Sequence, residues 1–479
     1  MNILHVLRQV RAATELRAVP RASQRHLYLA ENPLVIAMYT LAGEPFAPLA
    51  FVWGTDPHSP SHAVAYEPRN RDQRYAAIHR FAEVLGDYLA PFLEVEWETN
   101  PKSRKSFPTT PAGAPQIIVP NTGTQRALCR ALGRALRYRK ADGPTGVSPE
   151  TRWAGAHLTW LDYRTDLPGQ AVVVPATQAL STHWVTGQAE LEDENLAATL
   201  AWIDNDPARG LADIDKAETS AYGPHTDPDE DKHLIRLVQY RNGATSPARK
   251  AQAEKDIEAH VLPPLLQAYE ATHRAIGLLR ELPESPPAAS RWSHDERAWA
   301  YHASRCGGDE PPRFTVHPRV DRAVADCAEA ELRAQQLHVD TVYSDPLIMA
   351  ELVADGTAVL GVVESVDLSH KEIKPGNVRR TQVPLITMRC QHKPILPLHS
   401  RLWWEGPDLV VAELRQVTSA ADGWIVLLAL QDGHNRGTRI PQPGMPTVYA
   451  ALDRTAYPQP NSFGNTPWTH QPHNRDGAA

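Results

Sequence analysis

The residues best suited to a chemical role are arginines that repeat along one expected helix, between Gln125 and Tyr138. They are Arg126, Arg130, Arg134 and Arg137, and Lys140 follows just beyond the helix. Spacings of four, four and three residues place the arginines on one helical face. Guanidinium groups one turn apart suit successive phosphates, so the pattern predicts a contact with a nucleic-acid strand. The alternative is an ordinary solvated helix face.

A second group of candidate contact residues lies in the last third of the chain. Lys371, Arg379 and Arg380 cluster around one expected loop, where they could grip phosphates. Trp403 and Trp404 occupy an expected strand, in which neighbouring side chains point to opposite faces. One indole would pack in the core, and the other, taken as Trp404, could stack on a base or a partner. Core packing of both rings is the alternative.

The motifs of several common enzymes are absent from the sequence. It contains no G-x-x-x-x-G-K-[ST], H-E-x-x-H, G-x-S-x-G or G-x-G-x-x-G. A self-contained ATPase, zinc protease or α/β-hydrolase is therefore not expected, and neither is a bound cofactor.

Two groups of residues could hold a metal ion. Cys390 lies close to His392, but no second pair accompanies them. The run 294–296, His-Asp-Glu, precedes His302 on one expected helix, and only proximity in sequence connects them. We therefore expect no metal site.

Length and composition indicate a globular protein of two to four domains, with 479 residues and a net charge of −7. The negative charge argues against wholesale wrapping of nucleic acid but permits a local basic face. No apolar stretch approaches the roughly 20 residues that span a bilayer, and no signal peptide is evident. Four dispersed cysteines suit a reducing compartment, so we expect a cytoplasmic protein without a membrane partner.

The N-terminal third, residues 1–145, alternates expected strands and helices. A hairpin of Leu34–Thr40 and Leu49–Trp53 precedes a helix at Arg71–Leu93, a strand at Gln116–Val119 and the basic helix. This order resembles the RNase H-like fold of DnaQ-type and RecB-associated exonucleases. In that fold the first strand carries an acidic pair, whereas this chain has Met-Tyr-Thr at 38–40. The resemblance therefore implies a degenerate, non-catalytic copy.

The rest of the chain divides into a mainly helical region, residues 146–345, a β-rich region, residues 346–456, and a flexible tail, residues 457–479. The β-rich region has short Val-, Leu-, Ile- and Trp-rich runs separated by turns, which predicts a small closed β-barrel. It resembles the barrel inserted in superfamily 1 helicases of the Upf type, although no motor core follows. That resemblance implies contact with nucleic acid or with a partner.

These observations predict an α+β multi-domain protein with an RNase H-like mixed α/β domain, a helical middle and a C-terminal small β-barrel. The expected function is that of a non-catalytic nucleic-acid-binding accessory protein. It would work with a separate helicase or nuclease, in DNA processing or phage defence. The alternatives are a metal-dependent nuclease that uses atypical acids such as Glu44 and Asp56, and a scaffold that binds only protein.

Overall fold

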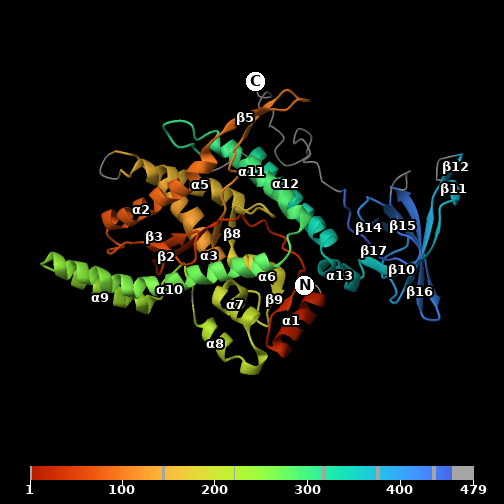
Figure 1. Cartoon of the computed structure of the whole chain (residues 1–479), viewed down its shortest axis with the longest axis horizontal. Coiled ribbons are helices and arrows are strands. Elements are labelled where there is room, and N and C mark those ends of the chain that lie inside the picture. The colour runs from red at the N-terminus through yellow and green to blue at the C-terminus, as the bar shows by residue number, and fades with distance from the viewer. Residues whose placement is uncertain are drawn as a thin grey trace, which may run out of the picture.

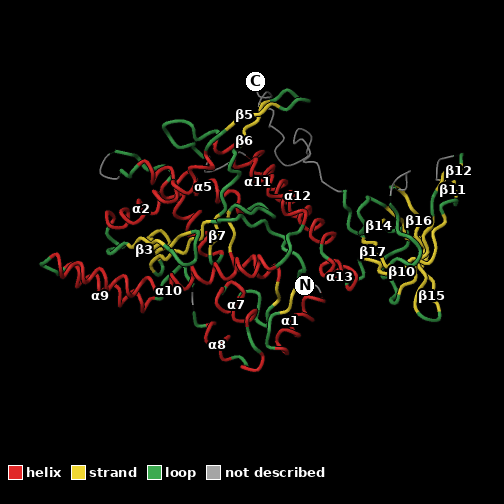
Figure 2. The backbone as a smooth tube through the Cα atoms, in the orientation of Figure 1, coloured by secondary structure: helices red, strands yellow, loops and turns green. Residues whose placement is uncertain are grey.

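The computed structural model describes residues 3–142, 146–220, 222–314, 320–373, 378–433 and 439–455. Helices and strands form a mixed α/β body, and an antiparallel barrel lies at one end of it (Figures 1 and 2). The expected tail, residues 457–479, lies outside the described residues.

A five-stranded sheet forms the centre of the body. Its strand order is β4 (Ser61–Val64), β3 (Glu44–Gly54), β2 (Leu34–Leu41), β7 (Ile117–Val119) and β8 (Val173–Pro175). The first three strands are antiparallel neighbours, whereas β7 runs parallel to β2 and β8 runs parallel to β7. Every residue of β2 is buried because this central strand has helices over both faces (Figure 1). The expected hairpin is confirmed by the pairing of β2 with β3.

Helices cover the two faces of this sheet. α2 (Arg71–Leu89) and α5 (Pro149–Thr165) lie on one side, and the long α10 (Pro247–Glu281) lies on the other (Figure 1). α2 begins at Asn70, whose side-chain oxygen accepts hydrogen bonds from two backbone N–H groups of the first turn. Its buried stripe includes Ile78, Phe81 and Leu85, which pack on the sheet.

The remaining elements complete the body and lead to the barrel. The helices are α1 (Ile3–Glu15), α3 (Thr122–Gln125), α4 (Gly133–Leu136), α6 (Ala176–His183), α7 (Leu196–Asp204), α8 (Ala212–Glu218), α9 (Pro228–Asn242), α11 (Pro286–Ala303), α12 (Val320–Ser344) and α13 (Pro346–Ala354). The short strands pair as β1 (Val19–Pro20) with β9 (Trp184–Val185) and as β5 (Glu96–Thr99) with β6 (Ser106–Thr109).

One hydrophobic core runs through the body from Ala18 to Ala303. The sheet crosses the boundary expected at residue 145, because β8 comes from the region expected to be mainly helical. Helices nevertheless predominate between α5 and α12. Across the described residues, no helix is both long enough and apolar enough to cross a membrane.

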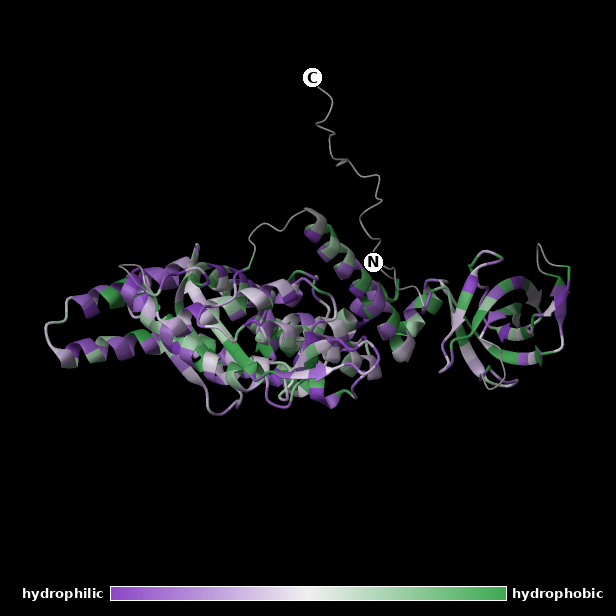
Figure 3. Cartoon of the chain, turned by 90° about the horizontal axis from the view of Figure 1, so that it is seen from above, coloured by the Kyte–Doolittle hydropathy of each residue, from purple (hydrophilic) through white to green (hydrophobic). Residues whose placement is uncertain are grey.

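The barrel confirms the expected small closed β-structure. Its strand order is β10 (Ala358–Asp367), β13 (Leu385–Cys390), β16 (Gly423–Asp432), β15 (Val411–Ala420), β14 (Arg401–Trp404) and β17 (Pro446–Ala450), and β17 pairs with β10 to close it. Side chains of β13 alternate between buried and half-buried, as a strand with one face on the core requires. Figure 3 shows hydrophilic and hydrophobic residues interspersed along the barrel strands.

A separate two-stranded ribbon, β11 (Lys371–Ile373) with β12 (Arg380–Gln382), projects from the outer end of the barrel (Figure 1). At the opposite end of the barrel, apolar side chains join it to the body. They are Ala22, Val342, Ile348, Met349, Ala358, Val448 and Ala450. The ribbon is therefore the part of the barrel region farthest along the chain's long axis from the body (Figure 1).

Candidate nucleic-acid interface

The basic helix forms where expected, but its geometry differs from that of a uniform α-helix. Asn121 caps it by accepting a hydrogen bond from the N–H of Thr124, and α3 then continues into a π-helical segment, Arg126–Leu132, before α4. The widened turn still brings residues four apart to nearly the same face, and Arg130 and Arg134 reach the same carboxylate, that of Asp162.

Two of these arginines neutralise a buried acid. Arg130 Nε lies 3.1 Å from Oδ1 of Asp162, and an Arg134 NH2 group lies 3.1 Å from Oδ2 of the same carboxylate. The Asp162 side chain is only 5% exposed, so it needs these charges as partners. Arg130 also approaches Asp166, one turn along α5, at 3.5 Å. Both arginines therefore hold α5 against the basic helix.

The other cations of the stripe divide between core and surface. Arg137 is 9% exposed, and its guanidinium lies over the ring of Tyr138, at 4.6 Å from the centroid. Arg126 and Lys140 are exposed, and neither has a carboxylate partner among the described residues. Of the five predicted contact residues on this helix, these two are the cations that remain free for a phosphate.

Two glycines permit the close approach of the basic helix and α5. A Cβ atom at Gly155 would lie 2.6 Å from the backbone nitrogen of Arg137 and 2.6 Å from Cβ of Leu136. A Cβ atom at Gly133 would lie 3.0 Å from Cβ of Leu158. The close packing of α5 on the basic helix, which brings Arg130 to Asp162, therefore depends on glycine at positions 133 and 155.

Gly155→Ala should lower the free energy of unfolding by about 1–3 kcal/mol, because the added methyl group overpacks a backbone contact. The measurement is the urea midpoint followed by tryptophan fluorescence. Gly277→Ala in α10 is the matched control, since its Cβ would meet nothing within 4 Å and alanine favours a helix by about 0.5–1 kcal/mol. Equal effects of the two substitutions would contradict the packing argument.

The β11–β12 ribbon presents a more accessible basic surface. Lys371 pairs with Gln382 across the ribbon, and Ile373 pairs with Arg380, so these four side chains share one face. All four are exposed, whereas Glu372 and Thr381 on the other face are half-buried. Arg379, next to the ribbon, is exposed as well.

The acid nearest in sequence does not neutralise this face. Glu372 lies 3.1 Å from Nε2 of His370 and 3.4 Å from Arg415, on the side turned toward β15. No carboxylate among the described residues forms an ion pair with Lys371, Arg379 or Arg380. A two-stranded ribbon of this kind fits the major groove of a duplex, and exposed cations on it can reach phosphates.

The expected stacking surface at Trp404 has to be corrected. Its indole is 2% exposed, lies in the barrel core and donates a hydrogen bond from Nε1 to Oγ1 of Thr447 at 2.6 Å. Trp403 is also buried, at 6% exposure. Both rings are therefore buried: Trp404 faces the inside of the barrel, whereas Trp403, on the other face of β14, lies under the guanidinium of Arg401 at 5.3 Å.

At the edge of the sheet where nuclease carboxylates were sought, the strand ends carry neutral groups, and the two acids near them, Asp231 and Glu194, come from other elements and accept local hydrogen bonds. The hydroxyl oxygen of Thr40, near the end of β2, lies 2.6 Å from Nδ1 of His225. Asn121, which follows β7 at the same edge, donates to the carbonyls of Tyr222 and Gly223. These polar groups are committed to local structure, and β2 itself holds no acid.

The two acids considered for an atypical nuclease site have structural roles. Glu44 forms an exposed ion pair with Arg69, and Asp56 accepts a hydrogen bond from the N–H of His58 within a turn. Across the described ranges, a single group of three potential metal ligands gathers, namely His157, His302 and Cys306, and it contains no carboxylate. The structure thus offers no carboxylate cluster for two-metal hydrolysis within the described residues.

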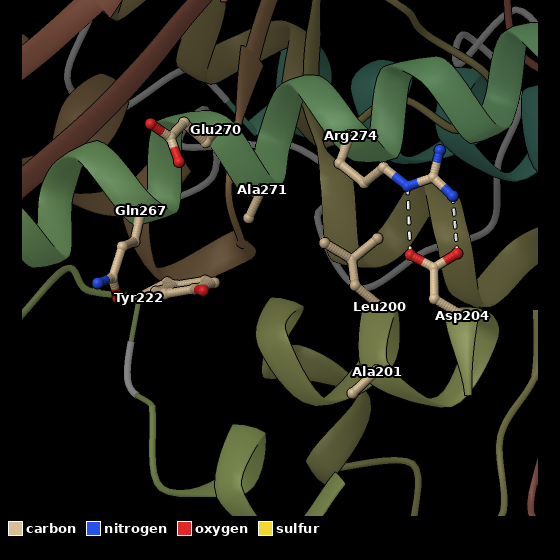
Figure 4. A pocket seen from close by; sticks show the side chains of 8 residues that line it. All are labelled: Leu200, Ala201, Asp204, Tyr222, Gln267, Glu270, Ala271 and Arg274. Atoms are coloured by element: carbon tan, nitrogen blue, oxygen red, sulfur yellow. Dashed lines mark hydrogen bonds and ion pairs between the residues drawn. The ribbon is translucent and has the colours of Figure 1, made fainter. Parts of the chain in front are cut away.

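A pocket of about 340 Å³ between α7 and α10 has no catalytic arrangement (Figure 4). Arg274 and Asp204 form two hydrogen bonds there, of 3.2 Å and 2.7 Å, and so neutralise each other. Glu270 and Tyr222 line another part of the wall (Figure 4). Because the one cation is already paired, the pocket provides no free charge for an anionic ligand.

Comparison of the chain with protein-family models, with curated proteins and with solved structures found no match. The ribbon is therefore judged by its own geometry. Sequence analysis identified its cations but missed Ile373 and Gln382, which share their face. The alternation Lys-Glu-Ile against Arg-Thr-Gln was the available signal.

Proposed function

We propose that this chain is a non-catalytic nucleic-acid-binding accessory protein that works with a separate helicase or nuclease, in DNA processing or phage defence. The exposed face of the β11–β12 ribbon makes the principal contact. Lys371, Arg379 and Arg380 bind phosphates there. Arg126 and Lys140 on the body provide a second, weaker contact.

The observation that carries this proposal is the absence of partners for the ribbon cations among the described residues. Arg130 and Arg134 are paired with a buried acid, so a phosphate would have to compete with Asp162 for them. The ribbon cations need no such exchange. Exposed apolar side chains beside them, Ile373 at 59% and Val378 at 95%, could insert against a base step.

We further propose that the body contains a degenerate RNase H-like domain. The arrangement that supports it is a first strand extended by an antiparallel hairpin, followed by a helix and a parallel strand with a polar residue, Asn121, just after it. Neutral residues stand where that fold carries its acids. The domain would then position a partner or a strand without cutting it.

The test is fluorescence anisotropy of the full chain with labelled single- and double-stranded DNA and RNA, repeated at several salt concentrations. Binding of duplex DNA through three to five phosphates should give a slope of log K against log salt of about −2.7 to −4.5. An affinity that does not change with salt concentration, or no binding to any of these probes at about 50 mM salt, would overturn the proposal. Such a result would favour the protein-only scaffold.

A further inference from the structure

Two helices of the body and the turn after the second bring three potential metal ligands together. His157 lies on α5, His302 lies in the last turn of α11, and Cys306 follows one turn later. The distance from Nδ1 of His157 to Nε2 of His302 is 3.0 Å, and the distance from that Nε2 to Sγ of Cys306 is 3.8 Å. All three ligand atoms lie within 4.8 Å of one another. A tetrahedral ion with bonds of about 2.0–2.3 Å to nitrogen and sulfur requires separations of this size.

The surroundings of these ligands suit a soft, borderline metal ion. His157 is 3% exposed and His302 is 2% exposed. Tryptophan rings enclose them: Trp160 stacks on His302 at 4.9 Å, and Trp299 lies 5.1 Å from the same imidazole. Two imidazoles and a thiolate form a donor set typical of zinc, whereas magnesium and calcium prefer oxygen ligands.

The protonation of the two imidazoles agrees with this role. Burial lowers the pKa of His157 to about 4 and lowers the pKa of His302, so both rings are neutral near pH 7. A neutral imidazole offers a lone pair to a metal. Burial raises the pKa of the Cys306 thiol, so loss of its proton would accompany metal binding.

Two of the three ligand residues also line a cavity. His157 and Cys306 line a space of about 390 Å³, together with Glu150, Trp153 and Leu93. Zinc sites with three protein ligands keep a position for water, and this cavity has room for it.

We propose that His157, His302 and Cys306 bind one zinc ion. The ion ties α5 to the end of α11 and the turn that follows it. The proposal does not depend on nucleic-acid binding.

The experiment uses the full chain, stripped of metal with a chelator and then titrated with Zn²⁺ or with Co²⁺ as a coloured substitute. The expected result is one equivalent of metal per chain, a sulfur-to-cobalt charge-transfer band, and a higher melting temperature with zinc. Cys306→Ser and His157→Gln should each weaken zinc binding by more than about 100-fold. Loss of a residue that only hydrogen-bonds to a metal ligand already weakens binding about 10–100-fold, and these two side chains are ligands themselves. Circular dichroism checks that each variant is folded.

Cys327→Ser and Cys390→Ser are matched controls, because one removes an exposed thiol and the other removes the thiol beside His392. Both should bind zinc as the parent chain does. The proposal fails if the folded parent chain takes up no stoichiometric metal, because the three groups then form only a hydrogen-bonded cluster. It also fails if Cys306→Ser leaves the charge-transfer band intact or if Cys390→Ser abolishes it.

Discussion

Replacing Lys371, Arg379 and Arg380 together with alanine should weaken binding of nucleic acid about 100-fold at low salt. Each lost charge-assisted contact removes roughly 1 kcal/mol, and each 1.4 kcal/mol is a factor of ten in affinity. The slope of log K against log salt should also become shallower by about 1 for each phosphate contact removed. Anisotropy with the same labelled strands measures both quantities.

The control removes three positive charges from another part of the same chain. Arg249, Lys250 and Lys255 are exposed on α10, and the triple alanine variant has the same net charge as the ribbon variant. Alanine also suits their helical backbone. We expect this control to bind nearly as the parent chain does. Equal losses in the two variants would mean that overall charge, and not the ribbon, attracts the ligand.

Asp345→Ala should lower the free energy of unfolding by about 3–5 kcal/mol, because it leaves several buried donors without their acceptor. The carboxylate is 1% exposed. It accepts hydrogen bonds from the backbone N–H and the hydroxyl of Ser23 at 2.7 Å and 2.9 Å, and from the N–H of Leu347 at 2.9 Å. Its Oδ2 also lies 3.1 Å from Nε2 of His26. This one side chain therefore joins the N-terminal segment to the start of α13, next to the junction with the barrel.

The matched control for this substitution is Asp422→Ala. Its carboxylate is 77% exposed and pairs with Arg389 on the barrel surface, so its loss should change stability by no more than about 1 kcal/mol. Urea unfolding followed by tryptophan fluorescence measures both variants. A loss below about 1 kcal/mol for Asp345→Ala would show that the buried donors find other partners.

The same carboxylate predicts a pH dependence. Burial alone would raise the pKa of Asp345, but hydrogen bonds from His26, Ser23 and Leu347 outweigh burial and hold the pKa well below its usual range. A carboxyl group with a lowered pKa in the folded state stabilises the fold fully above its unfolded pKa, which is about 3.9. That contribution is lost as the pH falls toward the folded pKa. Between pH 5 and pH 3 the parent chain should therefore lose more stability than Asp345→Ala loses.

Local patterns in the sequence predicted many of the elements. Short Val-, Leu-, Ile- and Trp-rich runs separated by turns marked the barrel strands, and the apolar runs at 34–40 and 49–53 marked the hairpin. Each of these patterns involves residues that are close together in the chain. Backbone geometry and the burial of one face determine the spacing of apolar residues there. The sequence also showed directly that the first strand of the sheet contains no carboxylate, because this depends only on the residues of β2.

Residue spacing was also informative for the proposed zinc site, although it was not sufficient. His302 and Cys306 are four residues apart, as two ligands at a helix end would be. His157 precedes them by 145 positions, and no local pattern connects it to them. In the sequence, His302 was considered only with the run 294–296 and no metal site was expected; of that run, Asp295 is buried and paired with Arg164.

The sequence by itself thus determined the hairpin, the helices at 71–93 and 125–138 and the closed barrel, and it grouped Lys371, Arg379 and Arg380 around a loop, whereas Lys371 and Arg380 lie in the paired strands β11 and β12. Tertiary structure alone decided which charges are available. Asp162 reaches Arg130 and Arg134 only because the two glycines let α5 pack against the basic helix. Trp404 is buried because its side chain faces the inside of the closed barrel, whose other strands come from separate segments of the chain. The physical reason is that periodicity shows which face a residue occupies, whereas the partner on that face comes from a distant segment and depends on how the elements pack.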